Sequence, residues 1–295
     1  MTDIALAAAL AAVPEAPRNR FLSLWEQHAI RRLETPAGPL EYTACGTGAR
    51  VLVHLPGLLS DAHAAVHLAP LLVRFRILTP TYLDTPDVAA QIDAVRRMLD
   101  AESAPRAAIL GQTLGGYLGQ MIASAHPARI SHLVLAHAGL PERDQMPSLA
   151  AMYRAVQLLP FALTSAYLAR IVLGGVAKAG RHPDIDPGEA SLILAYFRYR
   201  QSHLTRRTAL ARYGLSRAIG RAFPRYRDGL RSWPGRTLVF YGRGAWCNDR
   251  HVARLREYHT HVDARRFEAG GHWNLYLQPD ICARLIDAFI PTAAA

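Results

Sequence analysis

One hydroxyl residue stands between closely spaced glycines, where an expected strand meets an expected helix. Within Ile109–Gly116, Thr113 is flanked by Gly111 and Gly115. Nucleophilic hydroxyls are held on sharp strand-to-helix turns of this kind, because small neighbours let the two elements pass without a clash. Such turns normally carry serine, and threonine adds a methyl group that stiffens χ1 and narrows the approach to a carbonyl carbon. Thr113 is a candidate nucleophile for acyl transfer; the alternative is an elbow hydroxyl with no chemistry.

The elements expected around this segment predict an α/β fold. Short apolar runs that fit buried strands recur along the chain, and apolar residues at helical spacing separate several of them. Strands that alternate with helices are typical of a mainly parallel sheet with helices on both faces. The expected strands are two within 29–45, then 51–54, 76–81, 106–111, 131–137, 236–241 and 265–268. The expected helices are 87–99, 114–125, one near 249–259 and one from about 279 onward.

A long helical stretch interrupts this alternation after the strand at 131–137. We expect it to form a helical cap at 140–233, inserted into a core made of 1–139 and 234–295. The cap would lie at the carboxyl ends of the strands, where open α/β sheets place their ligands. Its first half, around 152–176, is apolar. A lid helix that lines an acyl pocket has this composition, and so does an ordinary helix packed on the domain.

The positive charge of the chain is concentrated in the second half of this cap. Between Tyr196 and Arg231 there are ten arginines and one acid, so the segment holds +9 of the net charge of +11. Basic residues interleaved with tyrosines can bind phosphates, nucleic acid or an acidic partner. A solvated helical face is the alternative that we favour. Because no nucleic-acid-binding motif accompanies the stretch, we do not expect a nucleic-acid partner.

Other features point away from metal sites, disulfides and membrane spans. The three cysteines are widely separated and show no C-x-x-C spacing, so we expect a reducing, cytoplasmic setting. The N-terminus does not resemble a secretory signal, and the apolar window 158–177 is interrupted by Pro160 and Arg170. His63 and His67 could share one face of a helix as metal ligands, but no third ligand follows at a suitable spacing. We expect them on a solvated helix.

Four segments, in this order, resemble those of the α/β-hydrolase superfamily. The resemblance extends from about Val51 to Ile290. The segments are an oxyanion loop at Leu55-Pro56-Gly57-Leu58, the nucleophile elbow around Thr113, the lead into the next strand at His126–Ile130, and a catalytic-histidine segment at Gly271-His272 followed by Pro279-Asp280.

The resemblance implies an α/β-hydrolase fold with a site between sheet and cap. By this likeness Thr113 is the nucleophile and His272 the general base and then acid. The backbone N–H groups of Leu58 and Leu114 are the oxyanion donors. The implied reaction transfers an acyl group from an ester or thioester to water, without a metal or an organic cofactor. The apolar and arginine-rich halves of the cap suggest a substrate with an acyl body and an anionic head.

The acid that usually orients the histidine is absent from both of its customary positions. One position is occupied by Ala245, and the other, after the strand at 131–137, offers Ala136 and His137. The nearest carboxylate is Asp249, for which we favour a helix-capping role beside Asn248.

Trp246 and Tyr167 are the candidate substrate contacts. Trp246 belongs to the loop of the absent acid, and Tyr167 to the apolar half of the cap. Two alternatives to a hydrolase stay open. One is a homologue that has lost hydrolysis and binds a ligand or a protein through the cap. The other is a lyase or isomerase in which Thr113 only donates a hydrogen bond.

Overall fold

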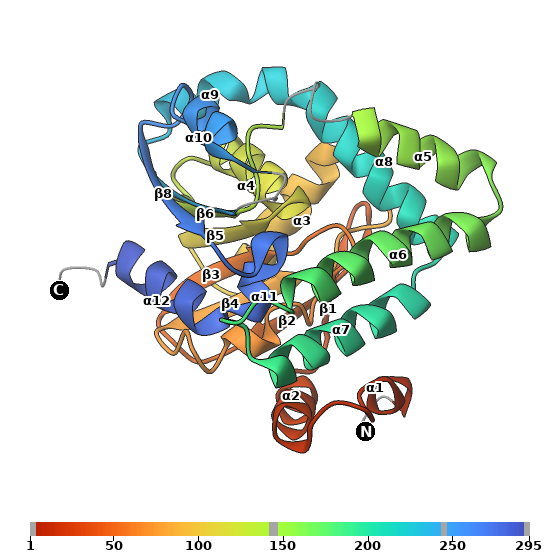
Figure 1. Ribbon diagram of the computed structural model, residues 1–295. Coiled ribbons are helices and arrows are strands. Elements are labelled where there is room, and N and C mark those ends of the chain that lie inside the picture. The colour runs from red at the N-terminus through yellow and green to blue at the C-terminus, as the bar shows by residue number, and fades with distance from the viewer. Residues whose placement is uncertain (1–3, 142–146, 243–246, 292–295) are drawn as a thin grey trace.

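The computed structural model describes residues 4–141, 147–242 and 247–291, and is built on an eight-stranded sheet (Figure 1). The strand order is β1-β2-β4-β3-β5-β6-β7-β8. The first strands form an antiparallel hairpin, β2 also pairs antiparallel with β4, and all other neighbours are parallel. The strands are β1 Arg31–Thr35, β2 Gly38–Cys45, β3 Arg50–Leu55, β4 Phe75–Pro80, β5 Ala107–Gln112, β6 Ile130–Ala136, β7 Arg236–Gly242 and β8 His261–Phe267. The expected α/β class and mainly parallel sheet are confirmed.

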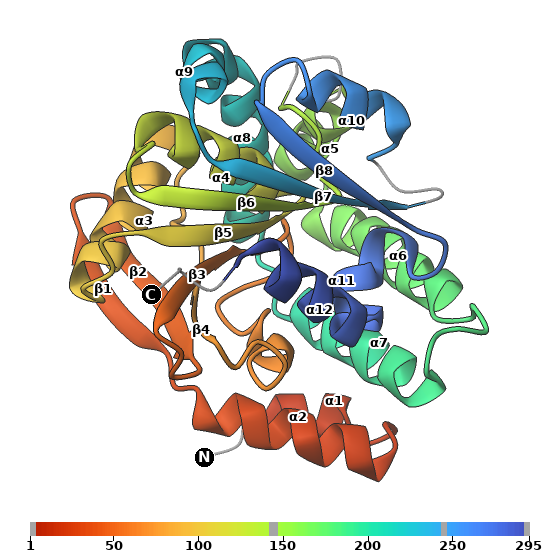
Figure 2. The same cartoon turned by 90° about the vertical axis from the view of Figure 1, so that its left-hand side faces the viewer.

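Helices cover both faces of the sheet. The core helices are α1 Ile4–Ala9, α2 Glu15–Gln27, α3 Val88–Ala101, α4 Leu114–Ala125, α10 Asp249–Leu255, α11 Asn274–Leu277 and α12 Pro279–Phe289, with short 3₁₀ turns η1 Val66–Leu68 and η4 Gly271–Trp273. Between β6 and β7 lie α5 Pro147–Leu158, α6 Phe161–Ala179, α7 Pro187–Ser202, α8 Arg206–Ala222, η3 Phe223–Arg225 and α9 Arg227–Ser232. We call these last helices the insertion. Of them, α5, α6 and α7 gather at the end of the sheet toward which the parallel strands point, whereas α9 lies near the end of α4, where the chain returns to the start of β7 (Figure 2).

The alternation of side chains along the strands divides the core into two layers. Every residue of β5 is buried, as a parallel strand covered on both faces requires. Ile109 faces the layer that contains α3 and α4, whereas Ala108 and Leu110 face the layer that contains α11 and α12. The sheet is thereby enclosed on both sides, so its functional groups must emerge at the strand ends.

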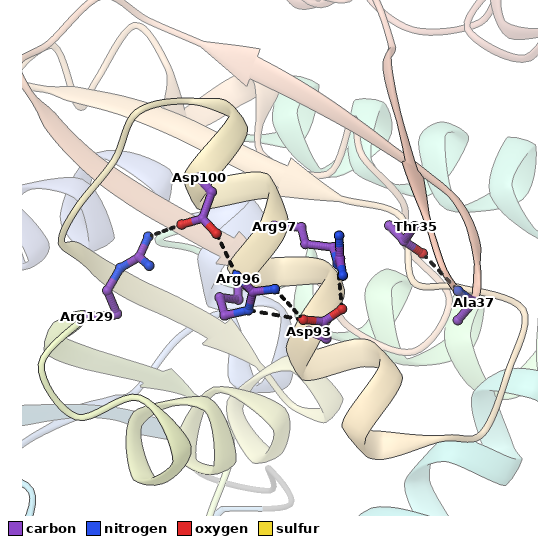
Figure 3. Close-up of polar contacts among 7 residues, drawn as sticks. All are labelled: Thr35, Ala37, Asp93, Arg96, Arg97, Asp100 and Arg129. Atoms are coloured by element: carbon purple, nitrogen blue, oxygen red, sulfur yellow. Dashed lines mark hydrogen bonds and ion pairs between the residues drawn. The ribbon is translucent and has the colours of Figure 1, made fainter.

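Helix α3 is capped at its start and carries an ion-pair network on its outer face. The Asp87 carboxylate accepts the backbone N–H of Ala89 at 2.8 Å. Further along, Asp93 pairs with Arg96 and with Arg97, each at 2.6 Å (Figure 3). Asp100 pairs with Arg96 at 2.7 Å and with Arg129 at 2.9 Å. Because Arg129 directly precedes β6, the network ties α3 to the start of that strand.

Two N-terminal helices that the sequence pattern did not reveal pack against the insertion. Leu6 and Leu10, from α1 and the turn that follows it, are fully buried. In α2, the ring of Phe21 meets the edge of Tyr196 in α7, with 5.7 Å between ring centroids. The N-terminal segment therefore extends the core beneath α7, as Figure 1 shows at the bottom of the molecule.

His63 and His67 are not on a solvated helix, and that expectation is wrong. His67 lies in η1 and His63 lies three residues before this turn, which packs against α2. The His63 ring is buried and stacks on Trp25 with 3.7 Å between centroids. His67 Nε2 donates to the carbonyl of Leu275 at 3.2 Å. Among the described residues, no group of three or more His, Cys, Asp or Glu side chains lies close enough together to hold a metal ion.

Helix α6 is the one helix in the described part of the chain that is long and apolar enough to cross a membrane. Its mean hydropathy is 1.2, and only 17% of the apolar window is buried. It packs along α7 on the outside of the insertion. A single helix of this kind does not establish a membrane span.

Candidate active site

Thr113 occupies a strained turn between β5 and α4. Its φ of 48° lies in the left-handed region, where a β-branched residue costs about 1–3 kcal/mol. The neighbouring glycines permit the close passage of the chain. A Cβ on Gly115 would overlap the carbonyl of Leu55, and one on Gly111 would lie 2.5 Å from the carbonyl oxygen of Gly115. The local geometry is therefore that of a nucleophile elbow.

The structure brings His272 to the hydroxyl of Thr113. His272 lies in η4, after β8 and the turn made by Gly270 and Gly271, whose φ angles are 76° and 51°. Its Nε2 atom is 3.2 Å from Thr113 Oγ1. The hydroxyl can donate to Nε2 only if the imidazole proton is on Nδ1. Burial and, to a smaller extent, the neighbouring His137 together lower the pKa of His272 to about 3, so the ring is neutral at pH 7.

No carboxylate of the described residues bonds the far side of the His272 ring. Its Nδ1 atom is buried and makes no hydrogen bond to any described residue. Asp249 is exposed at the first position of α10, where its carboxylate bonds Tyr241 and raises the pKa of that phenol. The cap of α10 is Asn248, whose Oδ1 accepts the N–H of Arg250 at 3.1 Å.

His137 occupies the space beside His272 instead. It follows β6 with a φ of 56°, and its ring centroid lies 5.2 Å from that of His272. His137 Nε2 is 2.9 Å from Asn274 Oδ1, and an amide oxygen can only accept. Nε2 therefore carries the proton, and His137 Nδ1 has a free lone pair. This atom, too, is buried without a partner among the described residues. Burial lowers the pKa of His137 to about 4.

The two expected oxyanion donors lie at the carboxyl ends of neighbouring strands. Leu58 follows β3 and Leu114 is the first residue of α4, which follows β5. The strands pair in parallel, with Leu55 opposite Gly111. As the first residue of a helix, Leu114 has an N–H without an i−4 carbonyl partner in the helix. Leu58 lines the same cavity as Thr113. The segments that carry both expected donors therefore lie near Thr113.

Thr113 and His272 line an apolar cavity of about 180 Å³ between the core and the insertion. The core contributes Leu58 and Tyr117, and the insertion contributes one or more residues from each of its four longer helices. These are Leu149, Ile171, Val172, Phe197 and Tyr213. An apolar cavity closed by helices suits a hydrocarbon group better than a polar one.

The two expected substrate contacts have different outcomes. Tyr167 is 55% exposed on α6 and does not line the cavity. Trp246, like Ala245, lies outside the described residues. The side chains that sequence reasoning missed are Trp273 and Phe197, which line the cavity, and Asn274, which holds His137. The sequence signals for these residues are their positions next to His272 and on an apolar helix.

No protein-family model matches the chain. Solved structures with similar folds include a hydrolase from Pseudomonas aeruginosa, 21% identical, with a TM-score of 0.71 over 89% of this chain and 98% of the other. An enol-lactonase from Burkholderia xenovorans is 18% identical, with a TM-score of 0.72 over 88% and 99%. A meta-cleavage product hydrolase from Pseudomonas fluorescens is 22% identical, with a TM-score of 0.63 over 88% and 96%. The chain has the α/β-hydrolase fold that its sequence motifs resemble.

Proposed function

We propose that the protein hydrolyses an ester or thioester of an acyl substrate, with Thr113 as nucleophile and His272 as general base. The observation that carries this proposal is the 3.2 Å contact between Thr113 Oγ1 and His272 Nε2 at the wall of an apolar cavity. The lining supports an acyl group as the part of the substrate that is bound there. The similar folds of a hydrolase, an esterase from Exiguobacterium antarcticum and an enol-lactonase support the reaction class.

The proposed reaction has two steps. Thr113 Oγ1 attacks the substrate carbonyl carbon as its proton passes to His272 Nε2, and the N–H groups of Leu58 and Leu114 bind the oxyanion. The alcohol or thiol then leaves with the proton from His272, so that the acyl group remains on Thr113. Water attacks this acyl-enzyme, again losing a proton to His272, and Thr113 is released as its hydroxyl with the acid as product.

In this proposal His137 is a positioning residue. The two Nδ1 atoms make no direct hydrogen bond, and in this proposal one bridging water donates to the Nδ1 lone pair of His137 and accepts from the Nδ1–H of His272. Such a bridge would satisfy two buried nitrogens, each of which otherwise costs about 1–3 kcal/mol. It fixes the tautomer in which Nε2 accepts from Thr113. A neutral imidazole stabilises an imidazolium less than a carboxylate does, so turnover should be slow.

The test is hydrolysis of acyl p-nitrophenyl esters and acyl thioesters of graded chain length. Thr113→Ala and His272→Ala should each lower kcat to the background rate. Two control variants, Thr35→Ala in the β1–β2 turn and His261→Ala on the exposed end of β8, should keep the wild-type rate. In that turn Thr35 Oγ1 accepts the N–H of Ala37 at 3.3 Å (Figure 3). Equal rates for the wild type and both site variants would exclude the Thr113–His272 mechanism.

A binding protein without hydrolysis is the second candidate, and one observation favours it. No described carboxylate reaches His272 Nδ1, as would be expected after a loss of catalysis. The open cavity beside Thr113 argues against this candidate, because an idle crevice could be filled by the insertion. The same series of esters and thioesters distinguishes the hydrolase from the binding protein, because a binding protein would hydrolyse them no faster than Thr113→Ala and His272→Ala do.

A further inference from the structure

A second cavity adjoins the catalytic one on the other side of the oxyanion segment. It has a volume of about 480 Å³ and lies between α2, the segment after β3, and the facing ends of α7 and α8. The two cavities share Leu58, Leu59 and Ser60 as a common wall. A ligand held in the second cavity would therefore lie against the segment that carries the proposed oxyanion donor Leu58.

Arg212 of α8 lines this second cavity as a buried cation without a direct carboxylate partner among the described residues, although Asp84 and Asp61 attract it at longer range. The residue is 3% exposed, and its guanidinium makes no hydrogen bond or ion pair with any described residue. Its one close interaction is with the ring of Tyr82, whose centroid lies 4.7 Å from the guanidinium carbon. Arginines are rarely buried unless they are paired, because desolvation of the charge is costly. The unpaired guanidinium therefore calls for an anionic partner.

Two of the three carboxylates that line the cavity already pair with other arginines. Asp61 pairs with Arg200 at 2.6 Å, and Asp84 pairs with Arg207 at 3.1 Å. Glu41 also lines the cavity, but its side chain is exposed to solvent, which screens its charge. Of the two arginines that line the cavity, Arg200 has a carboxylate partner and Arg212 has none among the described residues. The nearby carboxylates oppose a dianion such as phosphate and favour a ligand with a single negative charge.

We infer that Arg212 binds a free carboxylate of the substrate, which is therefore a monoester or monothioester of a dicarboxylic acid. This inference builds on the proposed function. The planar guanidinium can hold a carboxylate by two parallel hydrogen bonds. Tyr82, beneath the guanidinium, donates through its hydroxyl to the carbonyl of Pro56 at 2.7 Å. Pro56 belongs to the oxyanion segment, so the carboxylate subsite and Leu58 are parts of one connected framework.

The kinetic test compares paired esters across a series of chain lengths. Each p-nitrophenyl monoester of a dicarboxylic acid, from succinate to sebacate, is matched with the neutral ester of a monocarboxylic acid of equal length. The wild type should prefer the acidic member at one or more lengths by tenfold or more in kcat/KM. Arg212→Met should reduce this ratio to about one, and Arg212→Lys, which keeps the charge but not the fork, should give an intermediate ratio.

Arg221→Met is the matched control, because Arg221 lies on the same helix, is exposed and does not line the cavity. It should keep the wild-type ratio. Circular dichroism spectra of the variants will show whether they are folded. An acidic-to-neutral ratio of one in the wild type at every length, or an equal loss in Arg221→Met and Arg212→Met, would overturn the inference.

Calorimetry separates the failure of the subsite from the failure of the proposed reaction. Glutarate, adipate and suberate are titrated into the wild type and into Arg212→Met, with inorganic phosphate as a comparison. Binding of a dicarboxylate that is lost in Arg212→Met would support the subsite even if no ester is hydrolysed. Hydrolysis of neutral esters without dicarboxylate binding would overturn the subsite and leave the proposed function standing. Tighter binding of phosphate would overturn the assignment to a carboxylate.

Discussion

The rings of His272 and His137 lie 5.2 Å apart, and the Nδ1 atom of each is buried without a hydrogen-bond partner in the described part of the chain. Asn274 accepts from the other nitrogen of His137 at 2.9 Å and so leaves its Nδ1 as an acceptor. Asn274, His137, His272 and Thr113 are thus successive neighbours, and an imidazole lies beside His272 on the side where a catalytic triad usually has a carboxylate.

Replacing His137 by aspartate should accelerate hydrolysis. The backbone φ of 56° is one that aspartate and asparagine tolerate well. The amide Nδ2 of Asn274, which has no partner among the described residues, could turn to donate to the new carboxylate. A carboxylate at His272 Nδ1 would stabilise the imidazolium, so kcat should rise at least about tenfold, a part of the roughly 10⁴-fold that triad carboxylates supply.

The pH profile distinguishes this effect from a merely structural one. In the wild type the pKa of His272 is about 3, so its basic form is lost only as pH falls toward that value. An adjacent carboxylate favours the charged imidazole and raises this pKa, which should move the acidic limb of kcat/KM to higher pH. In His137→Asn the new side chain has the shape of aspartate but no charge. This variant should therefore leave the acidic limb of kcat/KM at the wild-type pH. An unchanged limb in His137→Asp would contradict the positioning role.

Replacing Thr113 by serine should also increase activity. Serine keeps the hydroxyl but lacks the methyl group that restricts χ1 and crowds a backbone held at a φ of 48°. Relief of about 1 kcal/mol in the transition state corresponds to about a fivefold increase in kcat/KM. The same substitution at Thr35, in the β1–β2 turn, should change nothing. A lower kcat/KM in Thr113→Ser would mean that the methyl group contributes to substrate binding.

Much of the sheet could be predicted from sequence because parallel strands are buried on both faces. Their continuous apolar runs place β3, β5 and β6 within about one residue of the structure. The glycine pattern around Thr113 likewise predicts a strained turn, because only small residues fit where β5 and α4 pass. Local chemistry determines both features, so one sequence suffices to find them.

Features that depend on distant contacts could not be predicted in this way. Tyr213 and Arg212 belong to a stretch that we interpreted as a solvated face, yet both are buried in α8. Their burial depends on how α8 packs against the core. His137 and Asn274 meet across 137 positions in the sequence, and no local pattern signals that pairing. The two Nδ1 atoms without partners became visible only after the whole chain was placed.

His54 in β3 should make the protein sensitive to acid. It is fully buried, both ring nitrogens lack partners among the described residues, and burial lowers its pKa from 6.5 to about 3. Between these values the unfolded chain binds a proton that the folded chain does not, so the free energy of unfolding falls as pH decreases. Between pH 7 and pH 5, the free energy of unfolding measured in urea should therefore fall by about 2 kcal/mol less in His54→Met than in the wild type. His261→Met, at an exposed site, should retain the wild-type pH dependence. Equal losses in His54→Met and the wild type would show that His54 is already protonated in the folded protein or shielded by water.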